Sequence, residues 1–210
     1  GGPDYKAFNL VNGKPEFMNK DAKAANAGGT YWIKDGDQVP FDDSKFKAGD
    51  EVCANLLDHG YGGFADYVSV PVAVAALKPA KLSFEEAAAV PMAATTALQG
   101  LGHHGDLQPT HKVLINGASG GVGSFAVQIA KASGAEVTAV TSTPNLDLVR
   151  SLGADHVLDY TTTDALGSGR RYDRILDTVG NRSVSDLRRG LATGGKAAVT
   201  LDHADGASLR

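Results

Sequence analysis

The pattern of hydrophobic and polar residues changes near residue 83. Before it, glycine, proline, aspartate and lysine separate short apolar pieces such as Glu51–Cys53 and Tyr67–Val70. This spacing is typical of short strands joined by turns, and it predicts an all-β or irregular region. Residues 1–45 have weak periodicity and scattered charge, so the pattern predicts no particular element there.

After residue 83 the pattern predicts helices and strands in alternation. Ser83 and Glu86 have the spacing of a capping box that opens a helix running to Val90. Pro91 is expected to interrupt this helix, because proline removes a backbone donor, and residues 93–101 are expected to form a second helical stretch.

Five apolar runs then predict strands, and apolar residues at helical spacing predict a helix after the first, the second and the fourth of them. Gly134 stands where a helix C′ glycine belongs, and Pro144 stands in the first turn of a later helix. This alternation predicts an α/β fold in which right-handed βαβ units build a doubly wound parallel sheet, covered on both faces. The predicted strands are Val113–Ile115, Val137–Val140, His156–Leu158, Arg174–Leu176 and Ala197–Val199. The apolar positions of the three predicted helices are Val122, Phe125, Ala126, Ile129 and Ala130 in the first, Leu146, Val149 and Leu152 in the second, and Val184, Leu187 and Leu191 in the third.

A glycine-rich turn follows the first of these strands. Ala118, Gly120 and Gly123 form a variant of the dinucleotide-binding G-x-G-x-x-G pattern between a strand and an amphipathic helix. A small first residue permits the turn, the second glycine admits a pyrophosphate, and the third allows close packing of helix on strand. The predicted phosphate-binding residues are Ala118, Ser119, Gly120, Gly121, Val122 and Gly123. A structural turn without a ligand is the alternative, and Gly117-x-Ser119-x-Gly121 also matches a hydrolase nucleophile elbow.

The end of the second strand bears on the choice of dinucleotide. An NAD site usually has an acidic residue about 20 positions after the glycine loop, bound to the ribose 2′-hydroxyl. Thr141, Ser142 and Thr143 occupy that place, and the first carboxylate is Asp147. Absence of negative charge favours NADPH, yet no arginine or lysine stands at 141–145 either, so NADH stays possible.

Composition restricts the classes of partner. The 210 residues are 42% hydrophobic and 21% charged, with a formal net charge of −4, which gives no general attraction to nucleic acid or to anionic membranes. One cysteine, Cys53, excludes an intrachain disulfide and fits a reducing compartment, and no apolar run is long enough to cross a bilayer. We therefore expect a cytoplasmic protein without nucleic-acid or membrane partners.

Several motifs in order resemble the medium-chain dehydrogenase/reductase superfamily, in its zinc-free quinone oxidoreductase-like branch. The resemblance extends from about Phe46 to about Thr200. It rests on the segments 46–52, 62–67, 82–91, 96–99, 116–123, 152–160 and 172–180.

The resemblance implies part of a GroES-like substrate-side domain at residues 1–84 and a Rossmann domain at 85–210. It also implies NADPH as cofactor and a quinone or an α,β-unsaturated carbonyl as substrate. A family member would continue beyond the fifth strand, so we expect the chain to be incomplete and its last Rossmann strand missing; a homodimer is possible.

Site residues follow from the resemblance by position. It places Thr96 against the nicotinamide, Ser142 near the 2′-phosphate and Tyr160 beside the adenosine. It adds Thr141, Val179 and Asn145 to the cofactor site, although some relatives carry a basic residue at the place of Asn145. Tyr5 is a candidate catalytic hydrogen-bond donor to a substrate carbonyl.

No metal is expected. Met92 stands where zinc-dependent relatives carry a cysteine ligand, and the adjacent His103 and His104 are more simply explained as loop residues. Two other functions stay open: a zinc-free alcohol dehydrogenase-like enzyme, and a dinucleotide-binding module without catalysis.

Overall fold

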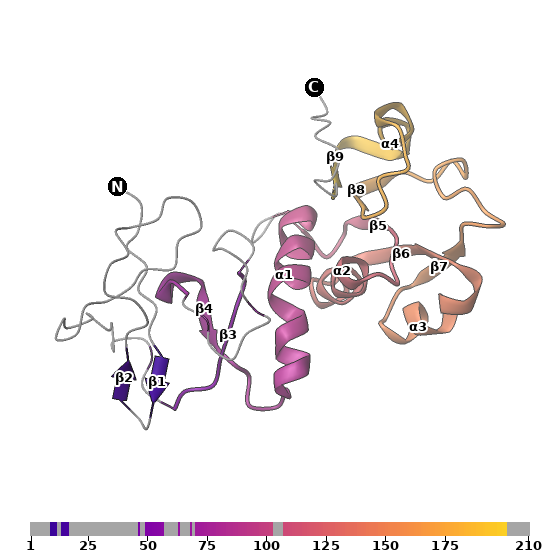
Figure 1. Ribbon diagram of the computed structural model, residues 1–210. Coiled ribbons are helices and arrows are strands. Elements are labelled where there is room, and N and C mark those ends of the chain that lie inside the picture. Colours follow the sequence, from indigo (N-terminus) through magenta and orange to yellow (C-terminus); the bar gives the residue numbers. More distant parts are fainter. Residues whose placement is uncertain are drawn as a thin grey trace. The chain divides into compact units, whose positions relative to one another are not determined.

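The computed structural model describes residues 46, 49–56, 63, 68, 70–102 and 107–200, together with the backbone of two short strands between residues 9 and 16. The chain forms two compact units, Gly1–Met92 and Ala93–Arg210 (Figure 1). The domain boundary predicted between residues 84 and 85 stays a prediction.

The first unit contains short antiparallel strands, in a region for which the sequence predicts an all-β or irregular structure and no particular element before residue 46. β1 (Asn9–Val11) pairs with β2 (Lys14–Glu16), and β3 (Val52–Ala54) pairs with β4 (Ala75–Leu77), which a 3-10 turn at Val72–Val74 precedes. After β4, Lys78 Nζ lies 3.1 Å from Glu51 Oε2 and 5.1 Å from the centre of the Phe84 ring. The GroES-like assignment of this unit stays a prediction.

The helix that follows, α1 (Phe84–Leu101), is continuous. Its capping box is confirmed, because Ser83 N donates to Glu86 Oε2 at 2.8 Å and Glu86 N donates to Ser83 Oγ at 3.2 Å. The predicted interruption is wrong, since Pro91 lies inside the helix. Proline costs an internal hydrogen bond, but tertiary packing supplies most helical stability, and Ala97 and Leu101 are buried beyond the proline.

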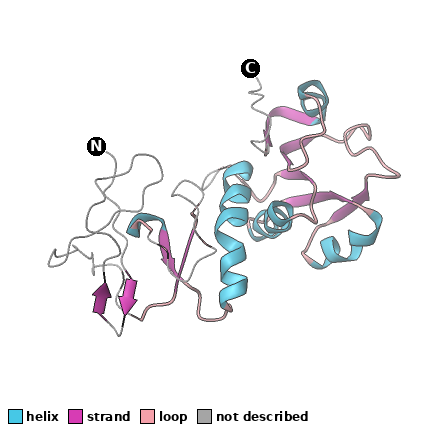
Figure 2. Cartoon of the chain, in the orientation of Figure 1, coloured by secondary structure: helices cyan, strands magenta, loops and turns pink. Residues whose placement is uncertain are grey.

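The second unit is built on a five-stranded parallel sheet, and the doubly wound α/β prediction is confirmed (Figure 2). Its strand order is β7-β6-β5-β8-β9, the Rossmann order in which the first strand lies at the centre. The elements are β5 (Lys112–Asn116), α2 (Gly121–Ala132), β6 (Glu136–Thr141), a 3-10 turn (Thr143–Asn145), α3 (Leu146–Ser151), β7 (His156–Asp159), β8 (Tyr172–Asp177), α4 (Val184–Gly190) and β9 (Leu191–Val199).

Strand register brings the carboxyl ends to one edge of this sheet. Asn116 at the end of β5 is in register with Val140 on β6 and with Asp177 on β8. Thr141 is in register with Asp159 on β7. In open α/β sheets, ligands bind beside this edge, where the direction of strand succession reverses.

The two faces of the sheet are covered unequally. The first face packs against the end of α1, against α2 and against α3, and its core includes Val113, Ile115, Val127 and Leu176. The second face is covered by α4 and by the β7–β8 connection.

That connection contains turns and no helix, and the sequence predicts no helix between His156–Leu158 and Arg174–Leu176. Ala165 is buried there, and Leu166 packs partly against the same core. The end of α4 differs from the prediction, because Leu191 begins β9 instead of closing the helix.

No helix in the described part of the chain is long and apolar enough to span a bilayer.

Asp155 ties α2 to the sheet. Its carboxylate accepts hydrogen bonds from Lys131 Nζ at 2.8 Å and from Val137 N at 2.7 Å. Burial raises the pKa of Asp155, but these bonds and the nearby charge of Lys131 lower it by more, so the net pKa lies below the ordinary value. The carboxylate therefore stabilises the fold above pH ~4 and loses this contribution as the pH falls through its folded pKa.

We expect Asp155→Ala to lower the free energy of unfolding by about 1–2 kcal/mol at pH 7, because the amide of Val137 loses its acceptor. Urea denaturation measures the difference, which should shrink as the pH is lowered below ~4. Asp147→Ala is the control, since its ion pair with Arg150 is exposed and should change stability by less than about 0.5 kcal/mol. Equal losses in the two variants would contradict the role of Asp155.

Candidate dinucleotide-binding site

The glycine loop is fastened to the neighbouring strand through its backbone. The amides of Gly117 and Ala118 both donate to Val140 O, at 3.1 and 2.9 Å, and Gly120 N closes a turn on Gly117 O at 3.0 Å. Gly117 has a φ of +82°, the left-handed region that favours glycine. Helix α2 begins at Gly121, and its N-cap residue, Gly120, supplies no side-chain hydrogen bond. The first amides of α2 are therefore left for another acceptor.

The glycines of this loop serve different purposes. A Cβ on Gly123 would lie 2.1 Å from Gly117 O and 2.8 Å from Ala118 Cα, so the fold itself requires glycine there. A Cβ on Gly121 would meet nothing closer than Ala93 Cβ at 4.0 Å, and one on Gly120 would lie 3.3 Å from Gly117 O. The fold does not require glycine at position 121. Gly120 and Gly121 are both exposed, and both leave room for a ligand to approach the backbone closely.

A cluster of hydroxyl and amide groups joins the glycine loop to the end of β6. Ser119 Oγ accepts a hydrogen bond from Thr141 Oγ1 at 2.7 Å and another from Asn145 Nδ2 at 3.3 Å. Asn145 Nδ2 also donates to Ser142 Oγ at 3.1 Å. The structure thus brings together four of the residues predicted to bind cofactor, and all four offer neutral polar groups.

A carboxylate stands next to this cluster. Thr143 Oγ1 donates to Asp159 Oδ2 at 2.5 Å, and Thr161 donates to Asp159 Oδ1 through its amide and its hydroxyl. The hydrogen bond from Thr143, followed by those from Thr161, lowers the pKa of Asp159, which is therefore ionised at neutral pH. The expectation that no negative charge lies near Thr143 is wrong, because the parallel register of β6 and β7 supplies one from the adjacent strand.

The opposite side of the loop is held by Asp177, which is fully buried at the end of β8. Its Oδ1 accepts hydrogen bonds from Asn116 Nδ2 at 2.8 Å and from the amides of Val179 and Gly180 at 3.0 and 3.1 Å. Thr178 Oγ1 donates to Asn116 O at 2.8 Å. Sequence reasoning placed Val179 in the cofactor site but missed Asn116, Asp177 and Thr178, although these three follow closely on the predicted strands Val113–Ile115 and Arg174–Leu176.

The other residues predicted for the cofactor site differ in their exposure. Tyr160, after β7, is 60% exposed, and Val179, after β8, is 53% exposed. Ala118 is buried, and Val122 and Thr96 are half-buried on α2 and α1. Tyr5, His103 and His104 lie outside the described residues, so the structure does not test their predicted roles.

Metal-binding groups do not gather in the described part of the chain. No three histidine, cysteine, aspartate or glutamate side chains lie together among the described residues. The absence of zinc predicted from the sequence stays a prediction.

Comparison with known proteins gives a consistent picture. A family model described as zinc-binding dehydrogenase matches residues 121–200. The chain is 38% identical over 160 residues to the chloroplast envelope quinone oxidoreductase homolog of Arabidopsis thaliana, covering 72% of this chain and 49% of that protein. It is also 38% identical to 2-methylene-furan-3-one reductase of Solanum lycopersicum, over 70% of this chain and 39% of that one.

A solved structure extends the likeness to the fold. The CurK enoyl reductase superposes with a TM-score of 0.65 at 32% identity, covering 73% of this chain and 47% of that one. The chain thus spans about half the length, or less, of the relatives it matches. Together with the Rossmann strand order and the glycine loop, these matches make the chain a member of the medium-chain dehydrogenase/reductase superfamily, within its quinone oxidoreductase-like group.

Proposed function

We propose that the protein is an NADPH-dependent oxidoreductase that reduces a quinone or an α,β-unsaturated carbonyl. One observation carries the proposal: Gly121 is exposed at the start of α2, a side chain there would meet nothing closer than Ala93 Cβ at 4.0 Å, and the helix amides beside it have no side-chain cap. Such a cradle fits a diphosphate, because helix N-termini favour anions and glycine permits close approach.

The proposed cofactor would use the residues around this cradle. Its diphosphate would lie against residues 119–123, its adenosine beside Tyr160, and its nicotinamide near Thr96 and Val179. The nicotinamide supplies the hydride, so the protein itself must orient the two reactants and exclude water. The names of the relatives, a quinone oxidoreductase homolog and an enone reductase, support the substrate class. The cytoplasmic location also stays a proposal, since several relatives have chloroplastic or mitochondrial names.

The test of this function is a binding and turnover experiment on the chain. Fluorescence titration should give saturable NADPH binding, and absorbance at the nicotinamide band should fall when a small quinone or an enal is added. Binding without oxidation would favour the alternative of a non-catalytic dinucleotide-binding module. Absence of binding would overturn the proposal.

The preference between the two dinucleotides should be small. Ser142 and Asn145 offer neutral hydrogen bonds to a 2′-phosphate, whereas ionised Asp159 beside Thr143 opposes its negative charge. We therefore expect NADPH to bind tighter than NADH by no more than about tenfold, which is about 1.4 kcal/mol.

Replacing Asp159 with asparagine keeps one acceptor oxygen for the amide of Thr161 and turns an NH2 group toward Thr143 Oγ1, which can accept its hydrogen bond, so the charge is removed while both contacts are kept. We expect Asp159→Asn to raise the ratio of NADPH affinity to NADH affinity by roughly three- to tenfold at low ionic strength, with a smaller effect at high salt. Paired titrations with both cofactors measure the ratio. Asp147→Asn, an exposed carboxylate paired with Arg150, is the control. An unchanged ratio in Asp159→Asn would show that the 2′-position lies elsewhere.

A further inference from the structure

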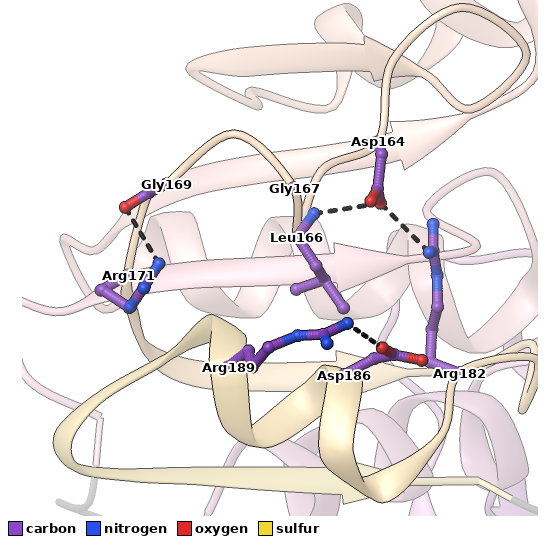
Figure 3. A pocket seen from close by; sticks show the side chains of 8 residues that line it. All are labelled: Asp164, Leu166, Gly167, Gly169, Arg171, Arg182, Asp186 and Arg189. Carbon is purple, nitrogen blue, oxygen red and sulfur yellow. Dashed lines mark hydrogen bonds and ion pairs between the residues drawn. The ribbon is translucent and has the colours of Figure 1, made fainter.

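A hollow separate from the glycine loop lies on the face of the sheet that the β7–β8 connection and α4 cover. Its volume is about 260 Å³, and its lining includes Arg171, Arg182 and Arg189 together with Asp164 and Asp186 (Figure 3). No residue of the glycine loop lines it. We propose that this hollow, which we call the arginine hollow, is a binding site for a small phosphate monoester. The proposal does not depend on the dinucleotide site.

Three separate segments bring the arginines to one place. Arg171 stands immediately before β8, Arg182 follows the end of the same strand, and Arg189 lies in the last turn of α4. The β7–β8 connection closes the hollow with Leu166 and with Asp164.

The carboxylates of the hollow are already engaged. Asp164 Oδ1 lies 3.1 Å from Arg182 Nη1, and that aspartate side chain is 57% exposed. Asp186 Oδ2 accepts hydrogen bonds from Ser183 Oγ at 2.6 Å and from Ser183 N at 3.3 Å, and its Oδ1 pairs with Arg189 (Figure 3). Each aspartate therefore neutralises one guanidinium.

The third guanidinium keeps its charge uncompensated. Arg171 Nη1 donates to the backbone carbonyls of Gly169 at 3.0 Å and Arg170 at 3.1 Å, and within the described residues it has no carboxylate partner. Three arginines and two aspartates leave one net positive charge in the hollow. An anion that enters would gain charge-assisted bonds from Arg171 first, and then from Arg182 and Arg189 if it displaces the carboxylates of Asp164 and Asp186.

Chemistry and size define the ligand class. Guanidinium groups present several donors in a planar fork that suits the oxygen atoms of phosphate. A volume of about 260 Å³ is near the lower end for small-molecule pockets, and Leu166 adds an apolar wall. A phosphate group attached to a small organic body matches both features better than a free phosphate ion does.

The experiment is isothermal titration calorimetry of the whole chain with phenyl phosphate and, separately, with inorganic phosphate at low ionic strength. We expect phenyl phosphate to bind tighter than inorganic phosphate. Arg171→Gln should weaken the binding of phenyl phosphate at least fivefold. The melting curve of this variant should match that of the parent, because the exposed Arg171 side chain bonds only to neighbouring carbonyls. Asp164→Asn should tighten binding about threefold, since it removes the charge that competes for Arg182.

Two control variants locate the site. Arg150→Gln removes an exposed arginine outside the hollow, and Gly121→Ala alters the other phosphate-binding candidate; both should leave phenyl phosphate affinity within twofold of the parent. Weakening by Gly121→Ala without weakening by Arg171→Gln would move the anion to the glycine loop and overturn the proposal. Equal loss of phenyl phosphate affinity in Arg171→Gln and Arg150→Gln would show only a general charge effect and would overturn the proposal. Undetectable binding of phenyl phosphate to the parent would also overturn it.

Discussion

Replacing Gly123 with alanine is expected to destabilise the fold by about 3 kcal/mol. The added Cβ would lie 2.1 Å from Gly117 O, and this carbonyl is the acceptor that closes the turn with Gly120. The backbone must shift to relieve the overlap, and the turn cannot shift freely because Gly117 N and Ala118 N are bound to β6. Overpacking of this kind typically costs 1–3 kcal/mol or more, depending on how far the surroundings relax.

Urea denaturation followed by circular dichroism measures this loss. Gly121→Ala is the matched variant, because its Cβ has ordinary space and alanine is a better helix residue than glycine. We expect Gly121→Ala to be as stable as the parent or more stable by up to ~1 kcal/mol. If Gly123→Ala unfolds at the same urea concentration as Gly121→Ala, the close approach of α2 to the turn is not a constraint on the fold.

The same Gly121→Ala variant should lose affinity for the dinucleotide by tenfold or more. A methyl group at the start of α2 would occupy the space into which we place the diphosphate, and it would hold the phosphate oxygens away from the helix amides. Loss of binding together with preserved stability is the combination that separates a ligand cradle from a structural turn. NADPH titration by fluorescence gives the affinity, and thermal unfolding gives the stability.

Gln128→Ala is the control for this variant. Gln128 is exposed on the same helix, and its side chain bonds to Ser124 O within the helix, so its removal should leave NADPH affinity unchanged. Parent-like NADPH affinity in Gly121→Ala would contradict the assignment of the diphosphate to this loop.

Local sequence signals were sufficient for the parallel sheet and for the glycine loop. The apolar runs locate all five strands of the second unit, and the loop between strand and helix is as the motif requires. Signals of this kind act within a few residues along the chain. Pro91 marks their limit, since a strong local signal for a break is overridden by packing of the helix beyond it.

Contacts between strands were harder to foresee. Asp159 reaches Thr143 across 16 positions of sequence, and Asp177 reaches Asn116 across 61. Both contacts follow from strand order and register, which fix which carboxyl ends are neighbours. The charge beside the predicted 2′-position therefore could not be read from residues 141–145 alone.

The uneven covering of the sheet has a consequence for how the fold opens. The first face is sealed by helices with a continuous apolar core, whereas the second face relies on a seven-residue helix and on Ala165 and Leu166 from a turn-rich connection. Local opening has its lowest free energy where few apolar contacts hold an element. Backbone amides of α4 and of the β7–β8 connection should therefore exchange fastest. The arginine hollow can then open locally while the strand ends that carry the glycine loop remain closed.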